Sequence, residues 1–220
     1  MRNIEFAENE YYHLVGHAID DLVLFSNKSE FSRFLLAILI FQAPVVLKNF
    51  NRVVKNFLKQ GVIDQTIIQR VIKSRYVDLV AYTIMNNHYH LLVREVSGKG
   101  IPQYMQRVLN AYGKFFNTKH ERKGHVFQGP YKAILVESNE QLLYLSAYIH
   151  RNPHELKKWR GKSKEYPWSS YRDYLNGNTW GGLINPNIVL DQVSNAEEYE
   201  GFVEGSDAKG HYDEDPDKAK

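Results

Sequence analysis

The chain has no cysteine among its 220 residues, which excludes disulfide bonds and thiolate metal ligands. Any metal ion must therefore be held by histidine, carboxylate, amide or water. The chain also has no apolar run long enough to span a bilayer. The longest run is FLLAILIFQAPVVL, which Gln42 and Pro44 interrupt. No charged, then apolar, then small-residue leader opens the chain. These absences predict a cytoplasmic protein that makes no use of a membrane.

The composition predicts one folded domain with appendages, since 43% of the residues are hydrophobic and can form a core. The net charge is only +3, yet between Arg94 and Arg172 Lys and Arg outnumber Asp and Glu by more than two to one. A basic middle is typical of nucleic-acid binders, and it also occurs in many other soluble enzymes. The end of the chain, SDAKGHYDEDPDKAK, is acidic and predicts a disordered tail over 206–220.

Hydrophobic periodicity, caps and breakers predict both strands and helices along the chain. Asn86-Asn87 is a two-residue loop of the kind that tolerates positive φ, and it joins two strands into a hairpin. Ser138 begins a capping box, and Pro153 biases Asn152 away from α geometry, so the helix that starts after Ser138 is expected to end or kink at Asn152. The expected strands are EYYHLVGHAID, YVDLVAYTIM, HYHLLVR and 132–136, and the expected helices are 29–42, two pieces within 43–74, 101–117, 139–152 and one in EYPWSSYRDYLNG.

Two histidines stand one residue apart in the strand HYHLLV. Side chains at i and i+2 share one face of a strand, so His88 and His90 lie side by side while Tyr89 faces the other way. Such a pair can offer two imidazole nitrogens to one divalent metal, although most His-x-His pairs in strands are structural. His13 and His17 share a face of the first strand, where we interpret them as ordinary strand residues.

The late helix carries Tyr144, Tyr148 and Asn152 at a spacing of four, so they form one stripe. A phenol with a pKa near 10 needs activation before it acts as a nucleophile. Helical geometry alone does not choose between the two tyrosines.

Four blocks in this order, MNNHYHLLV, GHVFQGPYKAILVE, YLSAYIHRNP and YPWSSYRDYL, resemble the single-tyrosine HUH transposases, in particular the REP-associated branch. The resemblance implies an α+β fold, ferredoxin-like or RRM-like, in which a central antiparallel sheet carries the HUH strand in its middle and helices flank it. It assigns His88, His90 and Asn152 as ligands of Mg²⁺ or Mn²⁺ and Tyr148 as the nucleophile. Tyr144 is expected to pack against the sheet.

The function implied by the resemblance is cleavage and rejoining of single-stranded or hairpin DNA through a 5′-phosphotyrosine link. Two other functions stay open: a domesticated, non-catalytic nucleic-acid-binding protein of the same fold, and a metal hydrolase that uses activated water. A nucleoid-associated location is expected, and the protein can be a monomer or a homodimer. The expected phosphate contacts are Arg107, Lys114, Lys119, Arg122, Lys123 and Lys132.

The resemblance divides the chain into a transposase domain over 1–180, a C-terminal extension over 181–205 and the acidic tail. The segment 43–74 is longer than the compact core of the family needs, and we interpret it as a helical insertion.

Overall fold

The computed structural model describes residues 5–20, 22–47 and 49–206, so residues 207–220 of the predicted tail lie outside the described residues. Among the described residues, no helix is long and apolar enough to cross a bilayer. The elements are β1 (Tyr11–His17), α1 (Lys28–Ile40), α2 (Phe50–Gln60), α3 (Gln65–Ser74), β2 (Val77–Ile84), β3 (His88–Glu95), α4 (Gly100–Lys119), β4 (Lys132–Val136), α5 (Asn139–Arg151), η1 (Asn152–Glu155), η2 (Lys157–Trp159), η3 (Ser163–Glu165), α6 (Tyr171–Asn176), α7 (Asn187–Leu190) and α8 (Ala196–Gly205).

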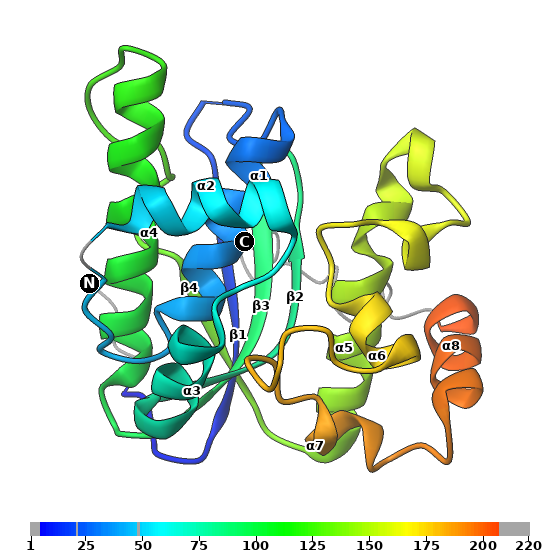
Figure 1. The fold of residues 1–220 in the computed structure, drawn as a ribbon. Helices are drawn as coiled ribbons and strands as arrows, with labels where there is room; N and C mark the ends of the chain where they lie inside the picture. Colours follow the sequence, from blue (N-terminus) through cyan, green and yellow to red (C-terminus); the bar gives the residue numbers. More distant parts are fainter. Residues whose placement is uncertain (1–4, 21, 48, 207–220) are drawn as a thin grey trace.

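The four strands form one antiparallel sheet in the order β2-β3-β1-β4. Strand β3, which carries the His-x-His motif, therefore lies in the interior of the sheet between β2 and β1 (Figure 1). The predicted α+β architecture with a central antiparallel sheet is confirmed.

Successive side chains of a strand point to opposite faces of the sheet, and in this sheet both faces carry apolar side chains. Leu14, Tyr89 and Leu91 are fully buried in a core shared with α1 and α4. Val80 and Leu92 point to the other face and pack with α5, α6 and α8. Figure 1 shows the sheet between these two helical layers, with α5 beside β2 and α4 on the far side. The two histidines of β3 share the face of Leu92, so they look toward α5.

Tyr89 is accommodated by a glycine on the neighbouring strand. A Cβ atom at Gly16 would lie 2.3 Å from the Tyr89 hydroxyl oxygen and 2.5 Å from its ring. Real Cβ contacts are longer, so a side chain at this position would displace the buried tyrosine. The large middle residue of the motif is thus packed away from the histidines, against Phe34 and Phe127.

Local signals in the sequence set several helix boundaries. The side chains of Asn27, Asp64 and Ser138 each accept a hydrogen bond from the first turn of the helix that follows, as expected of N-caps. Gly61 ends α2 in the left-handed conformation at φ 74°.

The predicted hairpin loop Asn86-Asn87 joins β2 to β3, and neither asparagine is among the described residues with positive φ. The backbone carbonyl groups of both asparagines accept hydrogen bonds from backbone amides of the segment that follows β1. The Asn86 oxygen accepts from the amides of Leu24 and Phe25, and the Asn87 oxygen accepts from Ala18, each at 2.7–2.9 Å. These bonds hold the loop in its observed backbone conformation.

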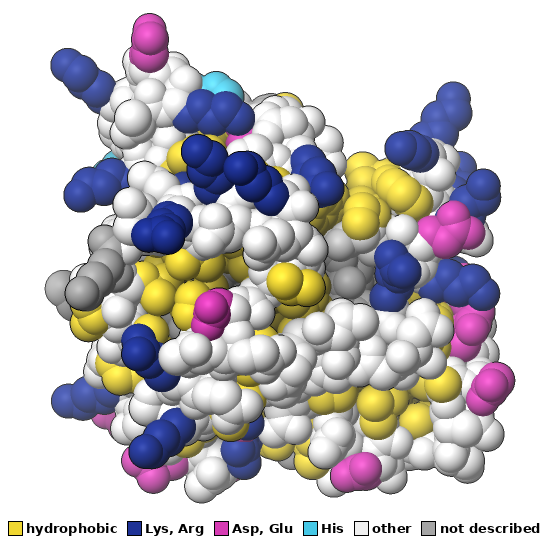
Figure 2. All heavy atoms as spheres, viewed as in Figure 1, with side chains coloured by type: hydrophobic (Ala, Val, Ile, Leu, Met, Phe, Trp, Pro, Cys, Tyr) yellow, Lys and Arg dark blue, Asp and Glu magenta, His cyan; other side chains and the backbone are white. Residues whose placement is uncertain are grey.

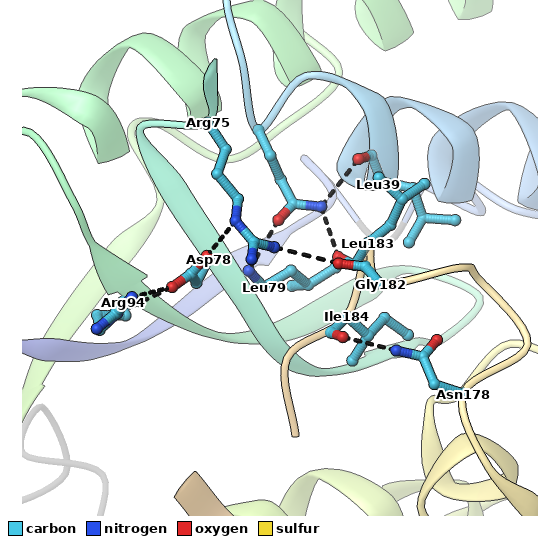
Figure 3. A network of polar contacts seen from close by, with 10 residues as sticks. Leu39, Arg75, Asp78, Leu79, Arg94, Asn178, Gly182, Leu183 and Ile184 are labelled. Atoms are coloured by element: carbon cyan, nitrogen blue, oxygen red, sulfur yellow. Dashed lines mark hydrogen bonds and ion pairs between the residues drawn. The ribbon is translucent and has the colours of Figure 1, made fainter. Parts of the chain in front are cut away.

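The segment after α6 is tied to the sheet by buried polar groups (Figure 3). The side chain of Gln42, fully buried, donates to the carbonyl oxygens of Leu39 and Leu183 at 2.8 Å and accepts from the amide of Leu79 at 3.0 Å. Arg75 donates to the carbonyl of Gly182 at 3.2 Å. The start of the predicted C-terminal extension is therefore joined to the sheet and to the end of α1.

Candidate active site

Two histidine pairs meet on the face of the sheet that α5 covers. Strand β1 pairs with β3 so that His17 lies opposite His88 and Val15 lies opposite His90. His13 pairs with Leu92, two residues beyond His90, and its ring stacks with that of His90 at a centroid distance of 5.2 Å. The rings of His17 and His88 stack at 5.1 Å. His13 and His17, which the sequence alone presents as ordinary strand residues, thus belong to the same cluster as the motif.

The buried pair of the cluster is hydrogen-bonded. The Nε2 atom of His13 lies 3.0 Å from the Nδ1 atom of His90, and both side chains are about 5% exposed. On the outer side, His88 is half-buried and its Nδ1 atom lies 2.8 Å from the Asn87 side-chain oxygen.

Asn152 brings the late helix to these histidines. Its Oδ1 atom lies 3.2 Å from Nε2 of His88, and its Nδ2 atom lies 3.3 Å from Nε2 of His90. The expectation that Pro153 turns Asn152 out of α geometry is wrong, because Asn152 has φ −50° and ψ −39° and the chain continues as the 3₁₀ turn η1. This helical conformation keeps Asn152 in register with Tyr148, one turn earlier.

Tyr148 lies against the same cluster. Its ring is perpendicular to that of His90 at a centroid distance of 5.3 Å and meets His13 at 6.1 Å. Tyr144, one turn further back, does not pack against the sheet as expected. Its ring contacts Phe202 of α8 at 5.1 Å, because α8 covers the outer side of α5. The structure therefore separates the two tyrosines that helical spacing left equivalent.

Helix α5 is held at both sides of this turn. The hydroxyl of Thr83 on β2 donates to the carbonyl of Ile149 at 2.6 Å. His150 is fully buried and lies 2.7 Å from the Tyr199 hydroxyl and 2.8 Å from the Ser170 hydroxyl. These contacts fix the position of Tyr148 and Asn152 relative to the sheet.

The histidines are held neutral. Burial, together with the neighbouring imidazoles, lowers the pKa of His90 well below its usual value and lowers that of His88 as well. Burial and the charge of Lys132 lower the pKa of His13 to about 3. A neutral imidazole keeps a lone pair, so His88 and His90 are competent ligands near neutral pH.

The site fits a divalent cation by its donor set. Both ring nitrogens of His88 face amide oxygens, Asn87 Oδ1 at 2.8 Å and Asn152 Oδ1 at 3.2 Å. A neutral imidazole has one N–H, so one of these contacts sets two lone pairs against each other, an arrangement that a cation relieves. Among the described residues, no group of three or more His, Asp or Glu side chains is arranged to hold a metal ion, and the donor that lies beside His88 on the late helix is the Asn152 amide oxygen.

The buried histidines predict an acid-labile fold. The pKa of His150, like that of His13, is lowered by burial to about 3 from 6.5. Between these values the unfolded chain binds a proton that the folded chain does not, so the unfolding free energy falls as the pH is lowered from 6.5 toward 3. We expect His150→Gln to reduce this slope by up to about 1.4 kcal/mol per pH unit. Urea unfolding at several pH values measures it, and equal slopes in both proteins would contradict the prediction.

The predicted phosphate contacts fall into three groups. Lys132 lies opposite Val15 in the sheet, and its charge acts on His13, so it is close to the cluster. Lys114, Lys119, Arg122 and Lys123 belong to the last turns of α4 and the turn that follows. Arg107 lies apart: it donates to the carbonyls of Ala43 and Val45, and its guanidinium covers the ring of Phe41.

Four further cations lie close to Asn152 in the chain and are not among the predicted phosphate contacts. Lys157, Lys158, Arg160 and Lys162 are exposed on the short turns that follow Asn152. Figure 1 shows these turns rising on the right above α5, and the end of α4 rising on the left. In the same view, Figure 2 shows Lys and Arg side chains over both of these parts. The run KKWRGK, which three residues separate from the end of the YIHRNP block, was the available signal.

Comparison with known proteins points to one family. The family model described as "Transposase IS200 like" matches residues 43–152, half of the chain, and this span includes the predicted helical insertion and ends at Asn152. A solved structure of a REP-associated tyrosine transposase bound to a REP hairpin is similar in fold, with a TM-score of 0.52 and 12% identity over 83% of this chain and 89% of that one. No curated protein matches the sequence significantly.

Proposed function

Because the chain belongs to the family of IS200-like transposases, we propose that it cleaves and rejoins single-stranded DNA through a covalent link to Tyr148. One observation carries the proposal: the Tyr148 ring lies against His90 and one helical turn from Asn152, beside two neutral histidines. This is the arrangement that transesterification by a tyrosine requires, with the nucleophile next to the place where the phosphate is held.

His88 Nε2, His90 Nε2 and Asn152 Oδ1 are the atoms that would hold Mg²⁺ or Mn²⁺. When bound there, such an ion supplies Lewis-acid stabilisation of the charge on a crowded phosphate. Imidazole is a softer ligand than Mg²⁺ prefers, so Mn²⁺ should support the reaction at least as well. These residues lie in one chain, so the site needs no residue from a second copy, and both a monomer and a homodimer can contain it.

In the proposed reaction, the Tyr148 oxygen loses its proton and forms a bond to a backbone phosphorus. The bond from that phosphorus to the 3′ oxygen breaks, and the 3′ oxygen takes up a proton. A 5′-phosphotyrosine and a free 3′-hydroxyl remain. Attack of a 3′-hydroxyl on the phosphotyrosine reverses these steps, so rejoining uses the energy conserved in the ester and needs no nucleotide cofactor.

Two other functions are distinguished by one experiment. A domesticated DNA-binding protein would bind without cutting, and a metal hydrolase would cut through activated water without a covalent link. The experiment incubates the protein with single-stranded hairpin DNA labelled at its 3′ end, the end that stays on the protein-linked fragment, and with Mn²⁺, and resolves the products on a denaturing gel. A labelled band that migrates with the protein and is lost after protease treatment supports the transposase reaction, and its absence in the presence of free cut DNA favours the hydrolase.

We also propose that DNA phosphates contact the exposed cations on both sides of the site. Lys123→Ala and Lys158→Ala are each expected to weaken DNA binding for all sequences and to reduce the slope of log affinity against log salt by at most about one unit. Each cation is exposed, although Lys158 also lies 4.9 Å from the Trp159 ring. Fluorescence anisotropy over a range of salt concentrations measures the slope.

Arg107→Ala is the matched control for these two variants. Its guanidinium is engaged with the Ala43 and Val45 carbonyls, so its loss should lower the melting temperature and leave the salt slope unchanged. If the lysine variants keep the native slope, the proposed DNA path is wrong.

A further inference from the structure

We propose that His13 is a positioning residue for the metal site: it accepts the Nδ1 proton of His90 and so directs the Nε2 lone pair of His90 toward Asn152. This inference rests on the proposed function, since it concerns the same site. It adds a residue from β1 to a site whose other members come from β3 and the end of α5.

The hydrogen bonds around His90 agree on one tautomer. The amide nitrogen of Asn152 lies 3.3 Å from Nε2 of His90, and an amide nitrogen can only donate. His90 Nε2 must then be the acceptor, so the single proton of this neutral ring is on Nδ1. That proton faces Nε2 of His13 at 3.0 Å, which accepts it. The same tautomer puts the lone pair on Nε2, the atom that would bind a metal ion in place of the Asn152 amide nitrogen.

Packing restricts His13 to this role. It is about 5% exposed, and its ring is nearly parallel to that of His90, with 21° between their planes. The Tyr148 ring meets both imidazoles edge to face. A shift of His13 would therefore change the orientation of His90 and the support under Tyr148 together. Outer partners of metal-binding histidines act in this way, by setting the tautomer and the direction of the lone pair.

Mn²⁺ binding to the full chain tests the inference, with titration calorimetry as the readout. In His13→Phe, an aromatic ring remains but the acceptor is lost, and we expect the dissociation constant to rise by about 10- to 100-fold. In His13→Gln, the amide oxygen can take the place of Nε2, and we expect affinity within about threefold of the native protein. His125→Gln removes an exposed histidine outside the cluster and controls for unspecific binding. His13→Met serves as the apolar variant if the phenylalanine protein does not fold.

A second readout separates positioning from packing. Formation of the protein–DNA adduct by the apolar variant should recover as Mn²⁺ is raised, because the defect lies in metal affinity. Native affinity in the apolar variant, or equal losses in His13→Gln and the apolar variant, overturns the inference. If the native protein binds Mn²⁺ no more tightly than a His88→Ala, His90→Ala double variant, the proposed metal site itself is wrong and the inference falls with it.

Discussion

Replacing Tyr148 by phenylalanine is expected to abolish the covalent DNA adduct while leaving the fold and DNA binding nearly unchanged. The substitution removes a single oxygen from a half-buried ring and keeps its edge-to-face contacts with His90 and His13. The rate of strand cleavage should fall by a factor on the order of 10³ or more, since the proposed nucleophilic oxygen is lost. The unfolding free energy should change by less than about 1 kcal/mol.

Tyr144→Phe is the matched control for this substitution. Tyr144 lies on the same helix, but its ring packs on Phe202 of α8, so its variant should retain most of the activity. Mass spectrometry of the DNA-linked peptide identifies the nucleophile directly. An adduct on Tyr144, or one that persists in Tyr148→Phe, would refute the assignment.

Replacing both His88 and His90 by alanine is expected to remove metal-dependent cleavage. Lewis-acid stabilisation of a phosphate contributes several kcal/mol, and about 1.4 kcal/mol corresponds to a tenfold rate change, so the loss should be roughly a hundredfold or more. Chelation of divalent ions in the native protein should have the same effect, and added Mn²⁺ should restore cleavage only in the native protein.

The double variant with His88→Ala and His90→Ala should also be less stable than the native protein. His90 is almost completely buried, and its loss leaves a cavity and unpaired atoms on Asn152 and His13. We expect the unfolding free energy to fall by about 1–3 kcal/mol, which thermal unfolding can follow. His125→Ala removes an exposed histidine and should affect neither quantity. If the double variant cuts DNA at the native rate in the presence of Mn²⁺, the metal-site assignment is incorrect.

The predicted family, the antiparallel α+β architecture and the interior position of the motif strand are confirmed. These features could be predicted because they depend on local patterns and on the order of motif blocks along the chain. Ser138 caps its helix as expected, because a cap involves only the residues of one turn. The catalytic, metal-binding and DNA-binding roles of individual residues stay predictions.

The expectations that were wrong concern contacts between distant segments. Asn152 keeps α geometry before Pro153, and its side chain contacts His88 and His90, which precede it by 64 and 62 residues. Tyr144 packs on α8 because that helix, more than 50 residues later, covers the outer side of α5. Arg107, which the charge pattern groups with the other cations, donates to backbone carbonyls between α1 and α2, and its role in DNA binding stays a prediction that Arg107→Ala tests.

By itself the sequence determined which side chains share an element: period two places His88 and His90 on one face of a strand, and period four places Tyr148 and Asn152 on one stripe of a helix. Only the tertiary structure decided which elements meet. His13 and His90 are 77 residues apart, and their hydrogen bond exists because β1 pairs with β3 in one particular register. That register follows from the packing of both faces of the sheet, with Gly16 fitting beneath Tyr89, and no periodicity within a single strand contains it.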